Sequence, residues 1–579
     1  MTQWPIYDDA SAVFPIYSRA NIGEIFPDPI SPLNASAGFQ ANLSPGWDDA
    51  FVACGVWDHA TYDSAVQHNV LPAFGSYLYI NMSLMRLFGV RVPGMTPEAV
   101  DLQYFGDMPG IPSYESEKRD FDENPEFEAT AGQWLAEQVL GAKDLAAYDA
   151  DRRTVEDIRK NRPAIADLGN QELRERITSF GDVLRPLLSR HIEASLKAGV
   201  GLGAVAQFTE AIGQPELALT LVAGIGDIDS TGPSTGMWAL SRLARTGAVA
   251  ALFDEGQDGL VERLRASGDP EVVAFTRQLD EFLTAWDFRG PSEWEIRAKT
   301  WGVKPSLALS TVDRMRQADD SAAPAVKNAE RVEQREAASA GVRAALAGND
   351  EALGQFEAVL HAAALWLRGR ERGRTSCAMV MHELRLPALE LGRRFTAEGH
   401  LERPEQIFML FAGELDGFLD DPASFSTTLR DREAAYLDLF DREPPFVVVG
   451  QPEPVENWPR RSGREVQPAV AGEVIQGVPG CNGSTRGRAR VVTNADDPSA
   501  LEPGEILVAP LTDPSWTPLF VPAAAVVVDV GAPFSHAAIV SRELGIPCVV
   551  SATAASARIP DGALIEVDGT TGTVTVLEV

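Results

Sequence analysis

The sequence predicts a multidomain α+β protein in which a mainly α-helical region precedes a small C-terminal α/β domain. The chain has 579 residues, which is too long for one hydrophobic core and is typical of about two to four domains. Apolar residues recur at steps of three and four over residues 128–440, as core-facing helices require. After residue 468 the pattern changes to short β-branched runs separated by glycine turns, which indicates strands.

Residues 1–45 are predicted to form an N-terminal arm packed over the helical domain. Three prolines within residues 17–33 exclude a long helix there and favour an extended, turning path. An aromatic run follows over residues 74–88, and Thr96 before Pro97 is typical of a helix N-cap with proline in the first turn.

The helical periodicity is clearest in residues 166–180 and 351–367. We expect one mostly helical domain over residues 1–442, including the arm. The glycine-rich stretch 224–236 interrupts the periodicity. Its glycines would allow backbone amides to surround an anion, but it matches neither a Walker nor a dinucleotide fingerprint. We therefore interpret it as an interhelical loop.

Residues 443–468 are rich in proline and charge, which is typical of a semi-rigid, exposed linker. Residues 469–579 then form the predicted C-terminal domain. Its expected strands are the β-branched runs at 489–493, 505–509, 525–530, 548–550 and 573–577.

Composition restricts the partners and the compartment. The net charge of -33 argues against nucleic acid and anionic membranes, because both require a basic surface. No apolar run is long enough to cross a bilayer, and the N-terminus lacks the features of a signal peptide. The four cysteines show no CxxC spacing, which is typical of reduced thiols without a disulfide framework or a zinc site. We expect a soluble, cytoplasmic protein.

His536 stands at the junction of an apolar strand, a Gly-Ala-Pro turn and a compact amphipathic helix that ends at Gly545 and Pro547. A helix N-terminus offers unpaired N–H groups and a positive dipole, which together hold a phosphoryl group. Neutral imidazole is a competent nucleophile near pH 7. A lone histidine is more often a core or surface residue, so the setting alone makes His536 only a candidate.

The residues around this histidine resemble the swivelling phosphohistidine domain of the PEP-utilising dikinases, which include PEP synthase, rifampicin phosphotransferase and phenylphosphate synthase. The match covers residues 531–547, 480–492, 503–519 and the Asp-Gly and Thr-Gly pairs at 568–569 and 571–572. Ala532 departs from the pattern, where the family often carries a second glycine. The resemblance implies a β/β/α swivelling domain in which His536 is phosphorylated and Ser535 contacts the substrate.

The preceding region is similar to the acceptor-binding domain of the rifampicin phosphotransferase branch. The similar segments are residues 19–33, 289–295 and 370–374. They imply catalytic roles for Arg289, Arg370, Glu371 and Arg374, and substrate-binding roles for Arg19 and Glu293.

Two of these positions depart from the family pattern. Arg374 stands where the family has lysine, so it can neutralise phosphate but cannot exchange a proton. Phe288 stands where a histidine often precedes the arginine that matches Arg289, which weakens any assignment of a base there. The helical spacing of Arg370, Glu371 and Arg374 also suits a solvated ion-pair face with no catalytic role.

Dikinases of this group use an ATP-grasp module to phosphorylate the histidine, and no nucleotide loop suited to ATP is evident in this sequence. The resemblance to phenylphosphate synthase implies a separate ATP-grasp subunit that binds Mg²⁺ and ATP, with no metal held by this chain. The net reaction would convert ATP, an organic hydroxyl acceptor and water to the phosphorylated acceptor, AMP and phosphate. The apolar and aromatic residues at 74–105 suit a phenol or a larger hydrophobic alcohol. A phenol loses its proton more easily than an alkanol, so the weak evidence for a strong base favours a phenol or cresol.

Two alternatives stay open. The chain is also compatible with the component of a rifampicin-type antibiotic phosphotransferase. It is equally compatible with a non-catalytic phosphocarrier or regulatory module, which would be phosphorylated without turning over a hydroxyl substrate.

Overall fold

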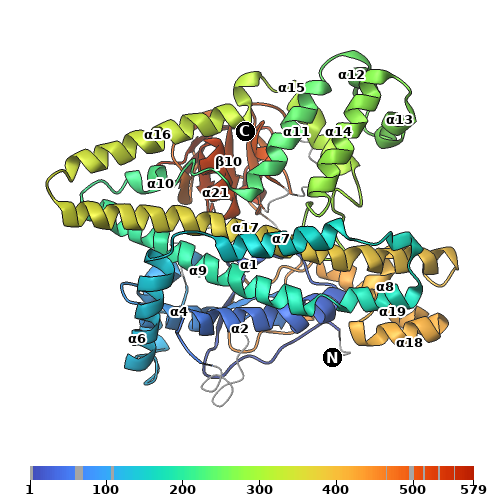
Figure 1. Cartoon of the computed structure of the whole chain (residues 1–579), viewed down its shortest axis with the longest axis horizontal. Coiled ribbons are helices and arrows are strands. Elements are labelled where there is room, and N and C mark those ends of the chain that lie inside the picture. Colours follow the sequence, from blue (N-terminus) through green and yellow to red (C-terminus); the bar gives the residue numbers. More distant parts are fainter. Residues whose placement is uncertain are drawn as a thin grey trace. The chain divides into compact units, whose positions relative to one another are not determined.

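The computed structural model confirms a mainly helical protein with a mixed β-sheet near its C-terminus (Figure 1). The structure describes residues 4–58, 70–105, 110–463, 466–493, 501–512, 516–531, 535–552 and 554–579. The chain divides into two compact units. Unit 1 comprises Met1–Gly201, Trp294–Ala298 and Leu365–Glu465, and unit 2 comprises Leu202–Glu293, Lys299–Ala364 and Val466–Val579. The predicted division at residues 442 and 469 stays a prediction.

Unit 1 is built mainly from helices. They are α1 (Ile22–Ile25), a π-helix (Asn34–Leu43), α2 (Ser44–Ala53), α4 (Met82–Arg91), α5 (Pro97–Phe105), α6 (Pro125–Trp134), α7 (Ala146–Lys160), α8 (Asn170–Thr178), α18 (Leu415–Asp420), α19 (Ser426–Leu439), most of α9 (Gly181–Ala211) and the second part of α17 (Asp350–Ala397). Short strands β1 (Ile16–Ser18), β2 (Ala73–Phe74), β3 (Tyr77–Leu78), β4 (Ile80–Asn81) and β5 (Val447–Val449) complete it.

The N-terminal arm turns as its prolines predict, but it is helical from Asn34 onward. The π-helix begins two residues after Pro32 and ends before Pro45, so no proline lies in its interior to break it. The predicted cap of α5 is also present, because the Ala99 N–H donates to Oγ1 of Thr96 at 3.1 Å.

The first part of the predicted linker differs from an exposed tether. β5 pairs antiparallel with β1 in a sheet of order β4-β1-β5. Val455 and Trp458 are buried with Tyr17 and Tyr77. The composition of residues 443–468 indicated exposure, but its few large apolar side chains were enough to fold this part onto unit 1.

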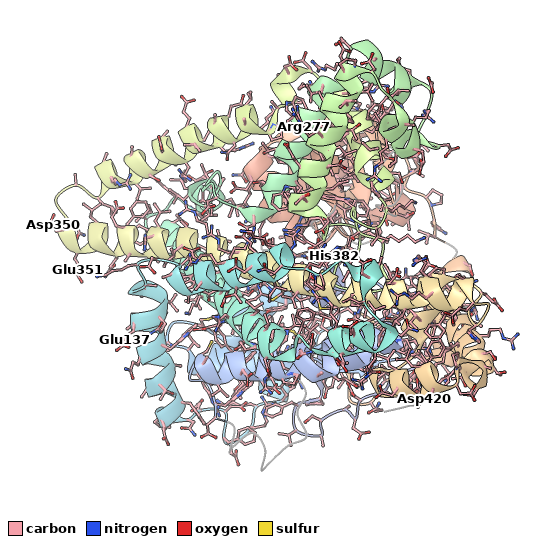
Figure 2. The ribbon with its side chains drawn as sticks, turned by 45° about the vertical axis from the view of Figure 1, so that its right-hand side comes forward. Glu137, Arg277, Asp350, Glu351, His382 and Asp420 are labelled. Atoms are coloured by element: carbon pink, nitrogen blue, oxygen red, sulfur yellow. The ribbon has the colours of Figure 1, made fainter. Side chains whose placement is uncertain are left out.

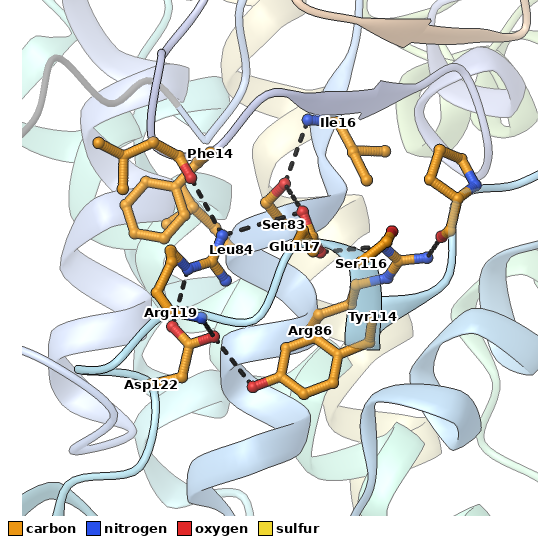
Figure 3. A network of polar contacts seen from close by, with 12 residues as sticks. Phe14, Ile16, Ser83, Leu84, Arg86, Tyr114, Ser116, Glu117, Arg119 and Asp122 are labelled. Atoms are coloured by element: carbon orange, nitrogen blue, oxygen red, sulfur yellow. Dashed lines mark hydrogen bonds and ion pairs between the residues drawn. The ribbon is translucent and has the colours of Figure 1, made fainter.

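A buried polar network fixes α4 to the segment that follows α5 (Figure 3). The fully buried guanidinium of Arg86 contacts Asp101 at 2.7 Å and Glu117 at 2.9 Å. Ser83 donates to the second oxygen of Glu117 at 2.7 Å and accepts from the Ile16 N–H at 3.1 Å. Arg119 lies 3.8 Å from Glu117 and supplies a second positive charge, while the Asp101 side chain stays 23% exposed.

Unit 2 combines helices with the sheet. Its helices are α10 (Leu217–Leu221), α11 (Gly232–Leu243), α12 (Gly247–Asp254), α13 (Leu260–Ala266), α14 (Pro270–Trp286), α15 (Ser306–Gln317), α16 (Pro324–Ala345), α20 (Thr517–Phe520), α21 (His536–Leu544), α22 (Ala555–Arg558) and the remaining parts of α9 and α17. Figure 1 shows α11 to α15 gathered in one cluster, in agreement with their mutual contacts. Asp350 and Glu351 expose two carboxylates in the first turn of α17, where they interact favourably with the positive end of the helix dipole (Figure 2).

The sheet of unit 2 has the order β6-β13-β12-β8-β9-β10-β11-β7. Its strands are β6 (Val474–Gln476), β7 (Val478–Cys481), β8 (Ser484–Val491), β9 (Ile506–Ala509), β10 (Ala525–Val528), β11 (Cys548–Val550), β12 (Leu564–Asp568) and β13 (Thr573–Glu578). β8, β9, β10 and β11 run parallel, and the outer pairs are antiparallel.

Both faces of β9, β10 and β11 are buried, which explains their continuous apolar runs. Leu507 and Val526 belong to the core that includes α21, whereas Ile506 and Val527 belong to the core on the other face. The alternation follows the two-residue period of a strand. It places the end of β10 next to the start of α21.

We expect Arg86→Ala to destabilise unit 1 by about 3–5 kcal/mol, because it removes the nearest cation from the buried carboxylate of Glu117 and leaves the more distant Arg119 at 3.8 Å. Hydrogen exchange at the amides of α4 and α5 measures this local free energy. Arg152→Ala is the matched control, since Arg152 pairs at 2.8 Å with the exposed Glu156 and its loss should cost less than about 1 kcal/mol. Equal effects of the two substitutions would contradict the role assigned to the buried network.

Candidate functional site

His536 is the first residue of α21, as the sequence predicted. Ser535 caps the helix with an extended backbone, and its Oγ accepts from the Ala538 N–H at 3.4 Å. The helix ends at Leu544, and Gly545 takes the left-handed conformation with φ 69°. The first-turn N–H groups and the helix dipole therefore favour an anion beside His536.

The imidazole of His536 is buried between two threonine hydroxyls. Oγ1 of Thr512 lies 3.1 Å from Nδ1, and Oγ1 of Thr517 lies 3.1 Å from Nε2. The ring of Phe520 meets the imidazole edge-on at 5.9 Å. A hydroxyl can donate or accept, so either neutral tautomer is satisfied. Phosphorylation of either nitrogen requires one of these two hydrogen bonds to open.

Gly531 allows the turn before the helix to pack closely. A Cβ there would lie 3.1 Å from both Ser535 Oγ and Val550 Cβ, closer than ordinary contact. The family departure at Ala532 lies outside the described residues.

The opposite end of α21 is bound by the glycine-rich loop. Glu543 is buried and accepts from the Ile225 N–H at 3.4 Å and from the Gly226 N–H. Burial raises the pKa of Glu543 to about 7 against the opposing effect of these amides. The amides of Ile225 and Gly226 therefore bind the carboxyl group of Glu543, a side chain of the same unit. The predicted interhelical loop ends earlier than expected, because α11 begins at Gly232.

Arg370, Glu371 and Arg374 lie together on the part of α17 that belongs to unit 1. Nη1 of Arg370 contacts Glu371 at 2.6 Å, and all three residues are buried. Burial contradicts the alternative of a solvated ion-pair face. In the described part of the chain, Nε and Nη2 of Arg374 are buried without a hydrogen-bond partner. A buried guanidinium with open N–H groups is suited to bind a phosphoryl oxygen.

His191 of α9 faces these arginines. Its Nδ1 lies 3.2 Å from the carbonyl oxygen of Arg370, so the ring donates from Nδ1. Burial, with smaller contributions from Arg370 and Arg374, lowers the pKa of His191 to about 3. The helices approach closely at Gly373, where a Cβ would lie 3.1 Å from the Cα and Cβ of His191. The imidazole is therefore neutral at ordinary pH.

Aromatic side chains lie beside His191. The ring centroid of Trp294 is 6.1 Å from that of His191 and 6.2 Å from that of Phe26. Asn34 donates to the Trp294 carbonyl oxygen at 3.1 Å. Within the described ranges, the indole N–H of Trp294 and Oδ1 of Asn34 are buried and unpaired. Unpaired buried polar atoms are costly, and they cluster where unit 1 also carries unpaired cationic groups.

Two other predicted residues occupy different surroundings. Arg289 forms a buried ion pair with Glu293 at 2.6 Å in unit 2, and its guanidinium lies 5.1 Å from the ring centre of Phe288. Arg19 in unit 1 donates to the carbonyl oxygens of Phe26 and Leu78, both at 2.8 Å. Arg19 thus fixes the backbone that precedes the π-helix.

No group of three or more His, Cys, Asp or Glu side chains is placed to hold a metal ion in the residues that the structure describes. Over the same ranges, no helix is both long and apolar enough to cross a membrane.

Two known family models match parts of the sequence. Residues 501–572, which include the described His536, match the mobile domain of the PEP-utilising enzymes. The chain carries this mobile domain. Residues 191–371 match the fourth domain of rifampicin phosphotransferase. The resemblance noted in the sequence is thereby confirmed.

Individual relatives cover different parts of the chain. An uncharacterized protein of Mycobacterium tuberculosis is 28% identical over 592 residues, which is 98% of this chain and 62% of that protein. The prodigiosin synthesizing transferase of Serratia marcescens is 30% identical over 57% of this chain and 37% of its own length. Rifampicin phosphotransferase of Bacillus cereus is 40% identical over 31% of this chain and 20% of its own length. The chain thus spans less than two thirds of the mycobacterial relative.

The fourth-domain match includes His191, a site residue that the sequence patterns did not single out. It begins at His191 and ends at Glu371, and the contact between His191 and Arg370 brings these two ends together. No local motif marks His191. Thr512 and Thr517, in contrast, lie within the segment 503–519 that already resembled the mobile domain.

The raised pKa of Glu543 predicts a pH-dependent stability of unit 2. The folded pKa of about 7 exceeds the ordinary glutamate value of 4.5, so the folded state retains a proton that the unfolded state loses between these pH values. Stability should therefore fall as pH rises from 4.5 to 7, by about 3 kcal/mol in total. Hydrogen exchange at the amides of α21 measures this loss.

Glu543→Gln should remove the slope and stabilise α21 at pH 8 relative to the natural chain. Glu578→Gln, at an exposed carboxylate of β13, is the control and should leave the slope in place. A slope that persists in Glu543→Gln would refute the assignment to this carboxyl.

Proposed function

We propose that the chain is a phosphotransferase component that carries a phosphoryl group on His536 and delivers it to an organic hydroxyl. The observation that carries this proposal is a buried imidazole at the N-terminus of α21, inside a match to a PEP-utilising mobile domain. The helix dipole and first-turn amides would stabilise the phosphohistidine, and Ser535 fixes the start of that helix. Covalent transfer through the imidazole divides one difficult step into two.

The acceptor is proposed to bind in unit 1 beside Arg374. Its open N–H groups would neutralise the phosphoryl oxygens during transfer, with Arg370 adding a second positive charge. The rings of Trp294 and Phe26 offer aromatic surface next to these cations. That combination supports a phenol or cresol as the acceptor, because such a ring stacks on aromatic side chains while its oxygen meets the arginines.

The phosphoryl donor is proposed to be Mg·ATP bound by a separate ATP-grasp subunit, as the resemblance to phenylphosphate synthase implies. Bound Mg·ATP would supply the phosphoryl group, and AMP and phosphate would be released.

A second candidate function is phosphorylation of a rifampicin-type antibiotic. The match of residues 191–371 to the fourth domain of rifampicin phosphotransferase favours it specifically. The two candidates differ only in the acceptor. Turnover of cresol without rifampicin supports the first, and the reverse supports the second.

His536→Ala should abolish labelling of the chain by β-labelled ATP in the presence of the ATP-grasp subunit. In the natural chain we expect one acid-labile label, as a phosphoramidate requires. His361→Ala replaces an exposed histidine on α17 and should leave the label unchanged. Label that persists in His536→Ala would refute the phosphohistidine, and label acquired without the added subunit would refute the two-component arrangement.

Arg374 should act after the histidine is phosphorylated. We expect Arg374→Gln to slow transfer from His536 to the acceptor about 10²–10³-fold, because it removes a cation that contacts the transferred group. Arg374→Lys keeps the charge and should retain most of the rate. The measurement is the decay of the acid-labile label after acceptor is added. Equal rates in Arg374→Gln and the natural chain would exclude this role.

A further inference from the structure

We propose that His191 is the catalytic base that removes the proton from the acceptor hydroxyl. This inference rests on the proposed function, and it assigns a residue that no sequence motif marks. The proposal stands on four structural features: a fixed tautomer, an open nitrogen, two neighbouring arginines, and the exclusion of two competing groups.

The tautomer of His191 is fixed by the backbone of α17. The carbonyl oxygen of Arg370 can only accept, so Nδ1 at 3.2 Å must carry the proton. Nε2 is then the basic nitrogen. It makes no hydrogen bond to any residue in the part of the chain that the structure describes. Gly373 holds this geometry, because any larger residue would push the two helices apart at His191.

The charged groups that act on His191 are Arg370 and Arg374, both on α17. They lower the pKa of the imidazole, as burial also does, so His191 never enters the reaction already protonated. An arriving phosphoryl dianion would neutralise the two guanidinium groups and thereby raise the pKa of His191. The base would therefore gain strength only when the group to be transferred is in place.

Two other groups near the arginines are less suited to this step. Glu371 has one oxygen bound to Arg370 at 2.6 Å, and proton uptake would break a buried ion pair. Tyr104 lies close enough for Arg370 to affect it, but burial raises its pKa and keeps its own proton in place. His191 alone among these three combines a neutral ring with an open basic atom.

The transfer step moves one proton to His191 and one phosphoryl group to the acceptor. The acceptor O–H bond breaks, its proton goes to Nε2 of His191, and its electron pair forms the new P–O bond. The P–N bond of the phosphohistidine breaks, and His536 leaves as neutral imidazole with a proton on its other ring nitrogen. His191 then gives its proton to water and returns to the starting tautomer.

The test uses the full chain, phosphorylated on His536 by the ATP-grasp subunit and then mixed with phenols of different acidity. His191→Asn places an amide N–H where Nδ1 was and retains the bond to Arg370, but it lacks Nε2. We expect about 10²–10³-fold slower transfer to weakly acidic phenols and less than about tenfold slower transfer to nitrophenols, which ionise without a base.

The pH dependence gives a second readout that a structural role would not change. The natural chain should transfer at a nearly constant rate between pH 5 and 8. In His191→Asn the rate should rise in proportion to the phenolate fraction. His191→Gln, with a non-basic amide near the position of Nε2, should behave like His191→Asn. Circular dichroism and thermal unfolding of the full chain report whether each variant is folded, because His536 labelling tests unit 2 and His191 lies in unit 1.

Each outcome is decisive. The same loss for every phenol, or parallel pH profiles, would refute His191 as the base while leaving the phosphotransferase proposal intact. A loss that depends on phenol acidity in Glu371→Gln but not in His191→Asn would move the role to Glu371. Failure of the natural chain to transfer its label to any hydroxyl would instead overturn the proposed function itself.

Discussion

The close approach of α9 and α17 is the constraint on which the candidate acceptor site depends. Gly373 removes the one side chain that would separate the helices at His191. The imidazole can then donate to a main-chain carbonyl of the facing helix, and the arginines of α17 come close enough to affect its protonation. Because the partner of His191 is backbone, its orientation does not depend on the rotamer of any neighbouring side chain.

Buried arginines in this protein differ in how their charges are compensated. Arg86 and Arg289 each form an ion pair with a buried carboxylate, which compensates their charges. Arg374 keeps two buried nitrogens unpaired within the described residues. A folded protein tolerates such a group only at a cost in stability, and an anionic ligand that completes the hydrogen bonds relieves it.

Sequence patterns predicted the elements that are defined locally and missed those defined by distant packing. The strand, turn and helix around His536 follow from neighbouring residues, and Gly545 alone sets the end of α21. The folding of Val455 and Trp458 onto unit 1 depends on aromatic residues several hundred positions away, so composition indicated only a linker. His191 was missed for the same reason, because its hydrogen-bond partner is a carbonyl oxygen 179 positions later in the chain.

The burial of His536 between Thr512 and Thr517 sets a kinetic requirement. With 2% of its surface exposed, the imidazole reacts only in the fraction of time that its surroundings are open. Under the proposed function, a complete turnover would need that opening twice, once to load the ring and once to unload it. Between the two events the same enclosure keeps water from the P–N bond, so the protein would store a labile, high-energy group with little leakage. The frequency of opening, rather than the chemical step, would then limit the turnover rate.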